Sequence, residues 1–183
     1  MQRLSTYVVV VALLIAAFRG SAYQITTSKP EKTSKELLTL SSEEEKESYD
    51  IYSTVLQIKE PNVTDWTIIQ ATRSFEPCSK PTRDQDAIYR PMIDDYVVKN
   101  RKTLVLQRKF QLPKYTLAAP EEWTRSANGS IFAVFSAVGF NMDRTRAAVC
   151  FWAHNSGTCS ILIKKKATWQ IDRDWPGGCG WAA

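Results

Sequence analysis

The first 22 residues have the organisation of a secretory signal peptide, and this feature most constrains how the remaining chain folds. Arg3 gives a basic start, residues 7–18 (YVVVVALLIAAF) form a short apolar run, and small residues at 20–22 precede Tyr23. Such a run is shorter than the roughly 20 apolar residues that cross a bilayer. We therefore expect cleavage after this leader, a secreted or periplasmic location, and no stable membrane insertion of the mature chain.

Four cysteines follow the leader, and an oxidising compartment favours their pairing into disulfides. Their spacings of 72, 9 and 20 residues match no zinc-binding pattern and contain no Cys-x-x-Cys pair. We expect two structural disulfides, with three connectivities open, among Cys78, Cys150, Cys159 and Cys179. The preferred pairing joins Cys159 to Cys179 and Cys78 to Cys150. Free thiols would instead indicate a reactive cysteine.

Composition limits the choice of partners. The formal net charge of the 183 residues is +5, and it falls to about +3 without the leader, which contains Arg3 and Arg19. So small a charge gives no reason to expect a nucleic-acid partner. The lysine run 164–166 lies between apolar segments and is typical of a solvated turn. The seven glycines form no phosphate-binding loop, and we expect no cofactor.

The chain has a single histidine, His154, which excludes metal sites built on several imidazoles. No Gly-x-Ser-x-Gly segment is present to hold a serine nucleophile. His154 is nevertheless the candidate general base of a hydrolase, with Asp143 or Asp172 as its carboxylate. The alternative is a histidine that only completes a hairpin turn. We expect no metal site.

Residues 23–40 are polar and without clear periodicity, so we expect a flexible tether before a single domain over 41–183. Ser42 and Glu45 have the spacing of a capping box and predict a helix over 42–58. Its apolar stripe is expected to enter the core: Tyr49, Tyr52, Val55 and Leu56, flanked by Ile51.

A second helix is expected over 90–101, with Pro91 in its first turn. The side chains expected to face the core are Ile93, Tyr96 and Val97. Those expected to face solvent are Asp94, Asp95, Lys99 and Arg101. Asp94 and Asp95 point about 100° apart on a helix, so they are poorly placed for a catalytic pair. One of them is expected to cap the helix or to pair with Arg90 or Lys99.

Residues 65–72 are β-branched and aromatic and predict a strand. Residues 104–112 alternate imperfectly and fit a strand or an extended connection. The pattern then becomes a β-meander joined by short turns, with runs at 131–138, 147–153, 160–164 and 168–171. The predicted class is α+β, with two amphipathic helices packed on an antiparallel β-meander sheet.

Three segments of this chain resemble segments found together in a known group of proteins. They are residues 48–53 (SYDIYS), 94–96 (DDY) and 135–147 (FSAVGFNMDRTRA). Through them the chain is similar to an uncharacterised family of small exported bacterial proteins with an FSxVGFNxDRTxA strand-turn-strand motif. The resemblance covers roughly 45–171. It implies export, one compact domain and a hairpin-rich C-terminal half, and it assigns no catalytic or ligand position.

In similar proteins the turn after the motif holds two closely spaced cysteines. Here only Cys159 is present, and Asn155 stands where its mate is expected. The resemblance therefore makes Cys150 and Cys179 the candidate replacements for that mate.

The C-terminal region is rich in tryptophan. Exposed indole rings stack on sugars and peptides, whereas buried ones cover the end of a sheet. The candidate binding aromatics are Trp152, Trp169, Trp175 and Trp181.

These features predict a small exported, disulfide-containing protein that is not an enzyme. It would act as a binding protein or an accessory envelope component, with an unidentified protein or glycan as partner. The alternatives are an exported hydrolase that uses His154 and an inhibitor or immunity-type protein that covers its target with the aromatic end.

Overall fold

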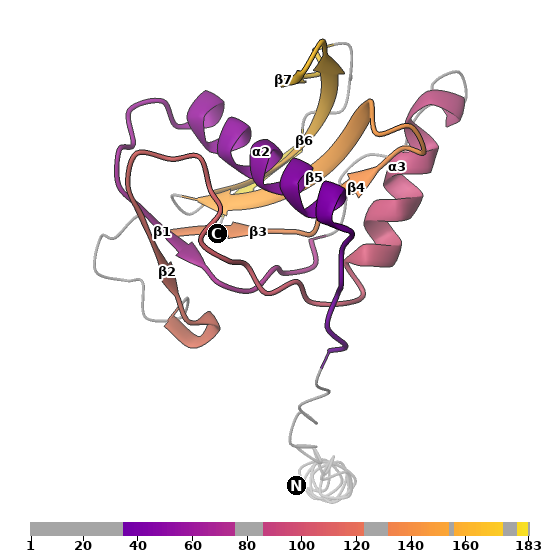
Figure 1. Cartoon of the computed structure of the whole chain (residues 1–183). Coiled ribbons are helices and arrows are strands. Elements are labelled where there is room, and N and C mark those ends of the chain that lie inside the picture. Colours follow the sequence, from indigo (N-terminus) through magenta and orange to yellow (C-terminus); the bar gives the residue numbers. More distant parts are fainter. Residues whose placement is uncertain (1–34, 76–85, 123–131, 154–155, 174–178, 183) are drawn as a thin grey trace, which may run out of the picture. The chain divides into compact units, whose positions relative to one another are not determined.

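The computed structural model describes residues 35–75, 86–122, 132–153, 156–173 and 179–182, and these residues form an α+β fold (Figure 1). The described helices are α2 (Ser42–Lys59) and α3 (Asp86–Lys99). The strands are β1 (Trp66–Ile69), β2 (Tyr115–Ala118), β3 (Phe132–Phe135), β4 (Gly139–Phe140), β5 (Arg146–Ala153), β6 (Ser156–Lys165), β7 (Thr168–Ile171) and β8 (Cys179–Ala182).

The strands form one mixed sheet in the order β2-β1-β3-β5-β6-β7, in which β4 also pairs with β5 and β8 with β6. The neighbours β3, β5, β6 and β7 are antiparallel, which confirms the predicted meander for this part of the sheet. The purely antiparallel sheet is wrong, because β1 runs parallel to both β2 and β3. Parallel neighbours need a long crossover, and the one from β1 to β2 contains α3.

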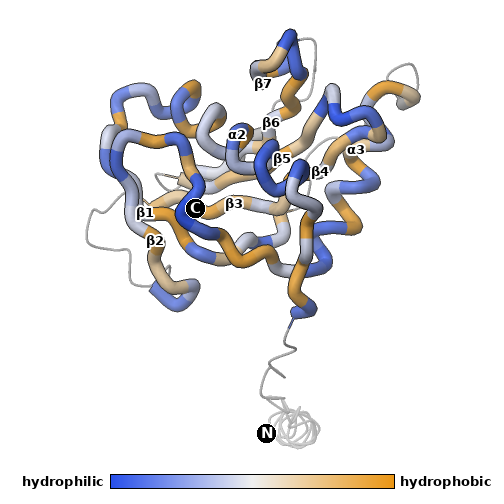
Figure 2. Tube along the Cα trace, viewed as in Figure 1, coloured by the Kyte–Doolittle hydropathy of each residue, from blue (hydrophilic) through white to orange (hydrophobic). Residues whose placement is uncertain are grey.

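The two helices lie on opposite faces of the sheet, as alternation along β5 shows. Val149 and Phe151 belong to the core cluster that contains α2, whereas Ala148 and Cys150 pack with α3. We call these two sides the α2 face and the α3 face. Figure 2 shows hydrophilic and hydrophobic segments alternating along both helices, as expected of elements with one buried side.

Helix α2 confirms the first predicted helix and its buried stripe, in which Ile51 and Tyr52 are fully buried. The capping box lies one residue earlier than predicted. The Ser41 side chain accepts a hydrogen bond from Glu44 N at 3.3 Å, and Glu44 Oε2 accepts one from Ser41 N at 3.1 Å. The sequence SSEEE contains both registers, and the extended backbone of Ser41 selects the earlier one.

Helix α3 begins at Asp86, so Pro91 lies inside it and not in its first turn. Its buried stripe contains Met92 and Tyr96, and the expected inward position of Val97 is wrong, since this side chain is 40% exposed. Val97 lies about 100° away from Tyr96 around the helix. Lys99 was expected to face solvent, but it is 9% exposed because it follows Met92 and Tyr96 along the same stripe.

The motif segment 135–147 packs directly against α3 at Gly139. A Cβ atom at Gly139 would lie 2.4 Å from both Met92 O and Tyr96 N, so only glycine permits this approach. The adjacent Phe140 N donates to Asp95 Oδ2 at 2.7 Å. The chain then turns, and Asn141 Oδ1 accepts hydrogen bonds from the two backbone N–H groups that follow the turn. Much of the motif therefore has a structural role.

Backbone hydrogen bonds to the domain begin before residue 41, the predicted start of the domain. Thr103 N donates to Glu36 O at 2.9 Å and Leu38 N donates to Thr103 O at 2.8 Å, so part of the expected tether lies against the domain. The segment 104–112 is an extended connection that touches the sheet through a bridge between Ala71 and Val105. Strand β2, which follows it, was not predicted.

Candidate functional site

A disulfide joins Cys150 and Cys159, which lie opposite each other on β5 and β6. The preferred pairing of Cys159 with Cys179 and of Cys78 with Cys150 is therefore wrong. Cys150 is the mate of Cys159 that the family resemblance offered, because the hairpin aligns these two residues. Cys179 lies on β8 at the register position opposite Cys159, and Cys78 lies outside the described residues.

The candidate general base His154 also lies outside the described residues, but both of its candidate carboxylates are described. Asp143 is exposed and accepts hydrogen bonds from Thr145 Oγ1 at 2.7 Å and Thr145 N at 3.2 Å, which lower its pKa. Asp172 is 7% exposed; Arg146 donates to it, and Tyr89 Oη donates to it at 3.3 Å. Both carboxylates thus have structural partners.

Both carboxylates lie near the Arg146 end of β5: Asp143 is in the turn before that strand, and Asp172 is bonded to Arg146. A general acid-base pair acts within hydrogen-bond distance of a shared substrate. Since only the carboxylates are among the described residues, a pairing with His154 stays a prediction.

The two candidate binding tryptophans whose side chains are described occupy different faces of the sheet. Trp169 is 6% exposed in the α2-face core, with its ring 6.0 Å from that of Phe140. Trp152 is half-buried on the α3 face beside Val134. These two rings therefore do not form a common exposed surface. The side chains of Trp175 and Trp181 lie outside the description.

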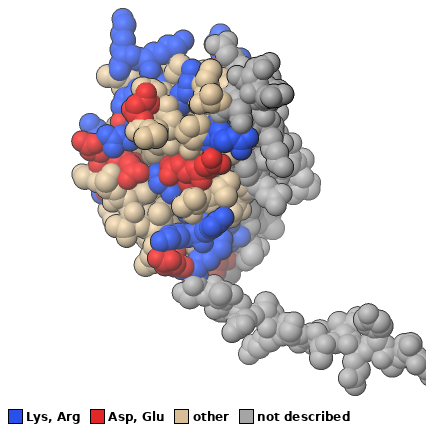
Figure 3. Space-filling view, turned by 90° about the vertical axis from the view of Figure 1, so that its right-hand side faces the viewer, with Lys and Arg blue, Asp and Glu red and all other residues tan. Residues whose placement is uncertain are grey.

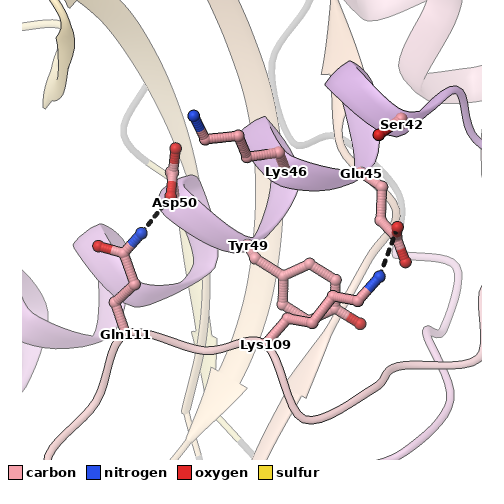
Figure 4. A pocket seen from close by; sticks show the side chains of 7 residues that line it. All are labelled: Ser42, Glu45, Lys46, Tyr49, Asp50, Lys109 and Gln111. Atoms are coloured by element: carbon pink, nitrogen blue, oxygen red, sulfur yellow. Dashed lines mark hydrogen bonds and ion pairs between the residues drawn. The ribbon is translucent and has the colours of Figure 1, made fainter.

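A first hollow, of about 200 Å³, lies between α2 and the 104–112 connection (Figure 4). Two pairs of polar side chains cross it: Lys109 Nζ with Glu45 Oε2 at 2.6 Å, and Gln111 Nε2 with Asp50 Oδ1 at 2.6 Å. Tyr49 forms its floor, and burial raises the pKa of the Tyr49 hydroxyl and of the Asp50 carboxyl. These pairs attach the 104–112 connection to α2, so the side chains around the hollow have a structural role.

A second hollow, of about 790 Å³, lies along β7 and the end of α2. We call it the β7 groove. Its described lining residues are Ile58, Lys59, Ile163, Lys165, Gln170, Ile171, Asp172 and Arg173. Among the described residues, no carboxylate pairs with Lys59, Lys165 or Arg173, and the groove's one acidic residue is already bonded to Arg146. The groove is therefore basic.

Other buried and half-buried cations of the described part are engaged. Lys99 Nζ pairs with Glu44 at 2.8 Å and with Asp95 at 2.7 Å, which confirms that one of the adjacent aspartates bonds to Lys99. Lys164 Nζ pairs with Glu47 at 2.5 Å. Figure 3 shows basic and acidic side chains interleaved on the face turned to the viewer. The three cations of the β7 groove are exposed and have no such partner among the described residues.

Within the described residues, no group of three or more His, Cys, Asp or Glu side chains is arranged to hold a metal ion. Neither described helix is both long and apolar enough to span a membrane. Comparison with protein-family models, curated proteins and solved structures finds no match to this chain. Family membership, export and bacterial origin therefore remain predictions from the sequence.

The β7 groove was not predicted from the sequence. The available signal is the lysine run 164–166, whose predicted solvated turn is confirmed at the exposed Lys166. In the structure Lys164 bonds to α2 on one face, whereas Lys165 lines the groove. Arg173 follows the β6–β7 hairpin that begins beside Lys165, but Lys59 is distant in sequence, so only the folded chain adds the third charge.

Proposed function

We propose that this chain is an exported, disulfide-containing binding protein that acts on a partner without catalysing a reaction. The observation that carries the proposal is the β7 groove. Its three cations, Lys59, Lys165 and Arg173, lack a described carboxylate partner, and apolar isoleucine side chains lie among them. Unpaired charges beside apolar surface are typical of a site that meets a complementary partner.

The buried Cys150–Cys159 disulfide supports the exported part of the proposal. Cytosolic thiols are kept reduced, so a structural disulfide between two central strands is characteristic of proteins that fold outside the cytosol. The secreted or periplasmic location inferred from the leader agrees with this chemistry.

The test asks whether the oxidised chain recovered after export catalyses hydrolysis. The wild-type chain and the variant His154→Gln are assayed on chromogenic ester, peptide and glycoside substrates. We expect no turnover above the buffer rate for either protein. Turnover by the wild type that His154→Gln abolishes, with unchanged circular dichroism, would replace the binding proposal with the hydrolase.

A further inference from the structure

We infer that the β7 groove binds an extended acidic peptide segment of a partner protein, which adds as a strand along β7. This inference rests on the proposed binding function and names its partner chemistry. Three observations support it: the edge of β7 that no other described strand pairs with, the charge of the groove, and the apolar surface between the charges.

The first observation concerns the backbone of β7. Among the described strands, β7 pairs only with β6. Asp172 N donates to Ile161 O at 2.8 Å, and Ile163 is opposite Gln170 in the same register. Hydrogen-bonded pairs alternate along an antiparallel ladder. The N–H and C=O groups of Trp169 and Ile171 therefore point away from β6, toward the edge.

The second observation concerns where the lining side chains originate. Gln170 and Ile163 share the α3 face, whereas Ile171 packs with the α2-face core. Ile58 and Lys59 come from the end of α2. Because lining residues come from both faces of the sheet, the groove follows β7 itself. An added strand, whose own side chains alternate between faces, would meet both sets.

The third observation concerns charge. Lys59, Lys165 and Arg173 are exposed and lack a described carboxylate partner, and Asp172 is compensated by Arg146. A strand with acidic side chains complements these cations. Ile58 is 49% exposed beside them, so aliphatic residues between the acidic ones would also be buried. The expected segment alternates acidic and aliphatic residues.

The test measures fluorescence anisotropy of a labelled eight-residue peptide of alternating Glu and Val with the oxidised, exported chain. We expect saturable binding that weakens as salt rises. The groove variant Lys59→Glu/Lys165→Glu/Arg173→Glu should bind at least about tenfold more weakly, since three ion pairs are lost. Its control, Lys46→Glu/Arg101→Glu/Arg108→Glu, changes the same net charge at exposed cations elsewhere and should bind like the wild type.

Two further probes separate strand addition from other modes. A peptide of the same sequence with alternate N-methylated residues keeps its charges but loses backbone donors, and it should not bind. Vesicles containing anionic phosphatidylglycerol, added to the complex of the chain with the labelled peptide, should leave the anisotropy of the peptide unchanged. Equal weakening in both triple variants, equal binding of the N-methylated peptide, or binding to vesicles alone would overturn the inference. The peptide experiments and the turnover assay have different readouts. Failure of the peptide to bind would overturn this inference, whereas turnover of the chromogenic substrates would overturn the proposed function.

Discussion

The side chain of Asn100 and the backbone of Ala137 are hydrogen-bonded in both directions. Asn100 Oδ1 accepts from Ala137 N at 2.9 Å, and Nδ2 donates to Ala137 O at 3.0 Å. The same Nδ2 donates to Tyr96 O at 2.8 Å. This buried amide therefore ties the end of α3 to the segment between β3 and β4.

Asn100→Leu should lower the free energy of unfolding by about 2 to 4 kcal/mol, because it leaves two buried backbone groups of Ala137 without partners. Urea denaturation measures the change. Gln57→Leu is the control, since it removes an exposed amide that donates to Gln111 O at 2.8 Å and should cost less than about 1 kcal/mol. Equal, small losses in both variants would show that the Asn100 pair is unimportant.

Gly139→Ala should be strongly destabilising, by about 2 to 4 kcal/mol, because the new methyl group would overlap backbone atoms of Met92 and Tyr96. Flexible side chains can move away from a clash, but helix backbone cannot do so without displacing α3. Thermal unfolding gives the stability, and near-ultraviolet circular dichroism reports the packing of Tyr96. An unchanged melting temperature would contradict the close approach of α3 to β4.

Stability should also depend on pH through Glu44. Burial favours a raised pKa for this carboxyl, but hydrogen bonds from Lys99 and Ser41 outweigh it and lower the pKa to about 2. A lowered pKa in the folded state stabilises the fold above the unfolded pKa, near 4.5. This contribution is lost as pH falls from about 5 to about 2.

Glu44→Gln should lower the free energy of unfolding at pH 7 by about 1 kcal/mol, since partly exposed ion pairs are screened by solvent. Urea titrations from pH 7 to pH 2 should show a shallower decline for the variant than for the wild type. Parallel curves for the two proteins would mean that Glu44 titrates alike in the folded and unfolded states.

The double variant Cys150→Ala/Cys159→Ala should unfold about 2 to 3 kcal/mol more easily. The disulfide closes a loop with a sequence separation of 9 residues, and this is the stabilisation that chain entropy gives for such a loop. Comparison of guanidinium midpoints in the absence of reductant measures it. An identical midpoint would show that the hairpin alone holds β5 and β6 in register.

Local patterns predicted the parts of the fold that short-range physics determines. The α2 stripe around Tyr52 repeats at helical spacing, and the hairpins after residue 130 join strands through short turns, so both were found. The parallel pairing of β1 was not found, because its partners are distant in sequence and long crossovers leave no local signal. The same reason explains why β2 was missed.

The site was less predictable than the fold. The sequence marked tryptophans and a histidine, but Trp169 is used in the core. The motif at 135–147 carried no functional assignment, and in the structure Gly139 serves packing and Asn141 serves turn geometry. The basic groove combines Lys165 and Arg173, which one hairpin brings together, with Lys59 at the end of α2, and the addition of Lys59 is a property of tertiary structure.

The central prediction is that this chain folds in a compartment where its cysteines oxidise. Expression with the leader in an exporting host, followed by N-terminal sequencing and non-reducing peptide mapping, measures this. We expect a chain that begins at Tyr23 and contains a peptide cross-linked through Cys150 and Cys159. An uncleaved 183-residue chain recovered from the cytosol with free thiols at both positions would contradict it.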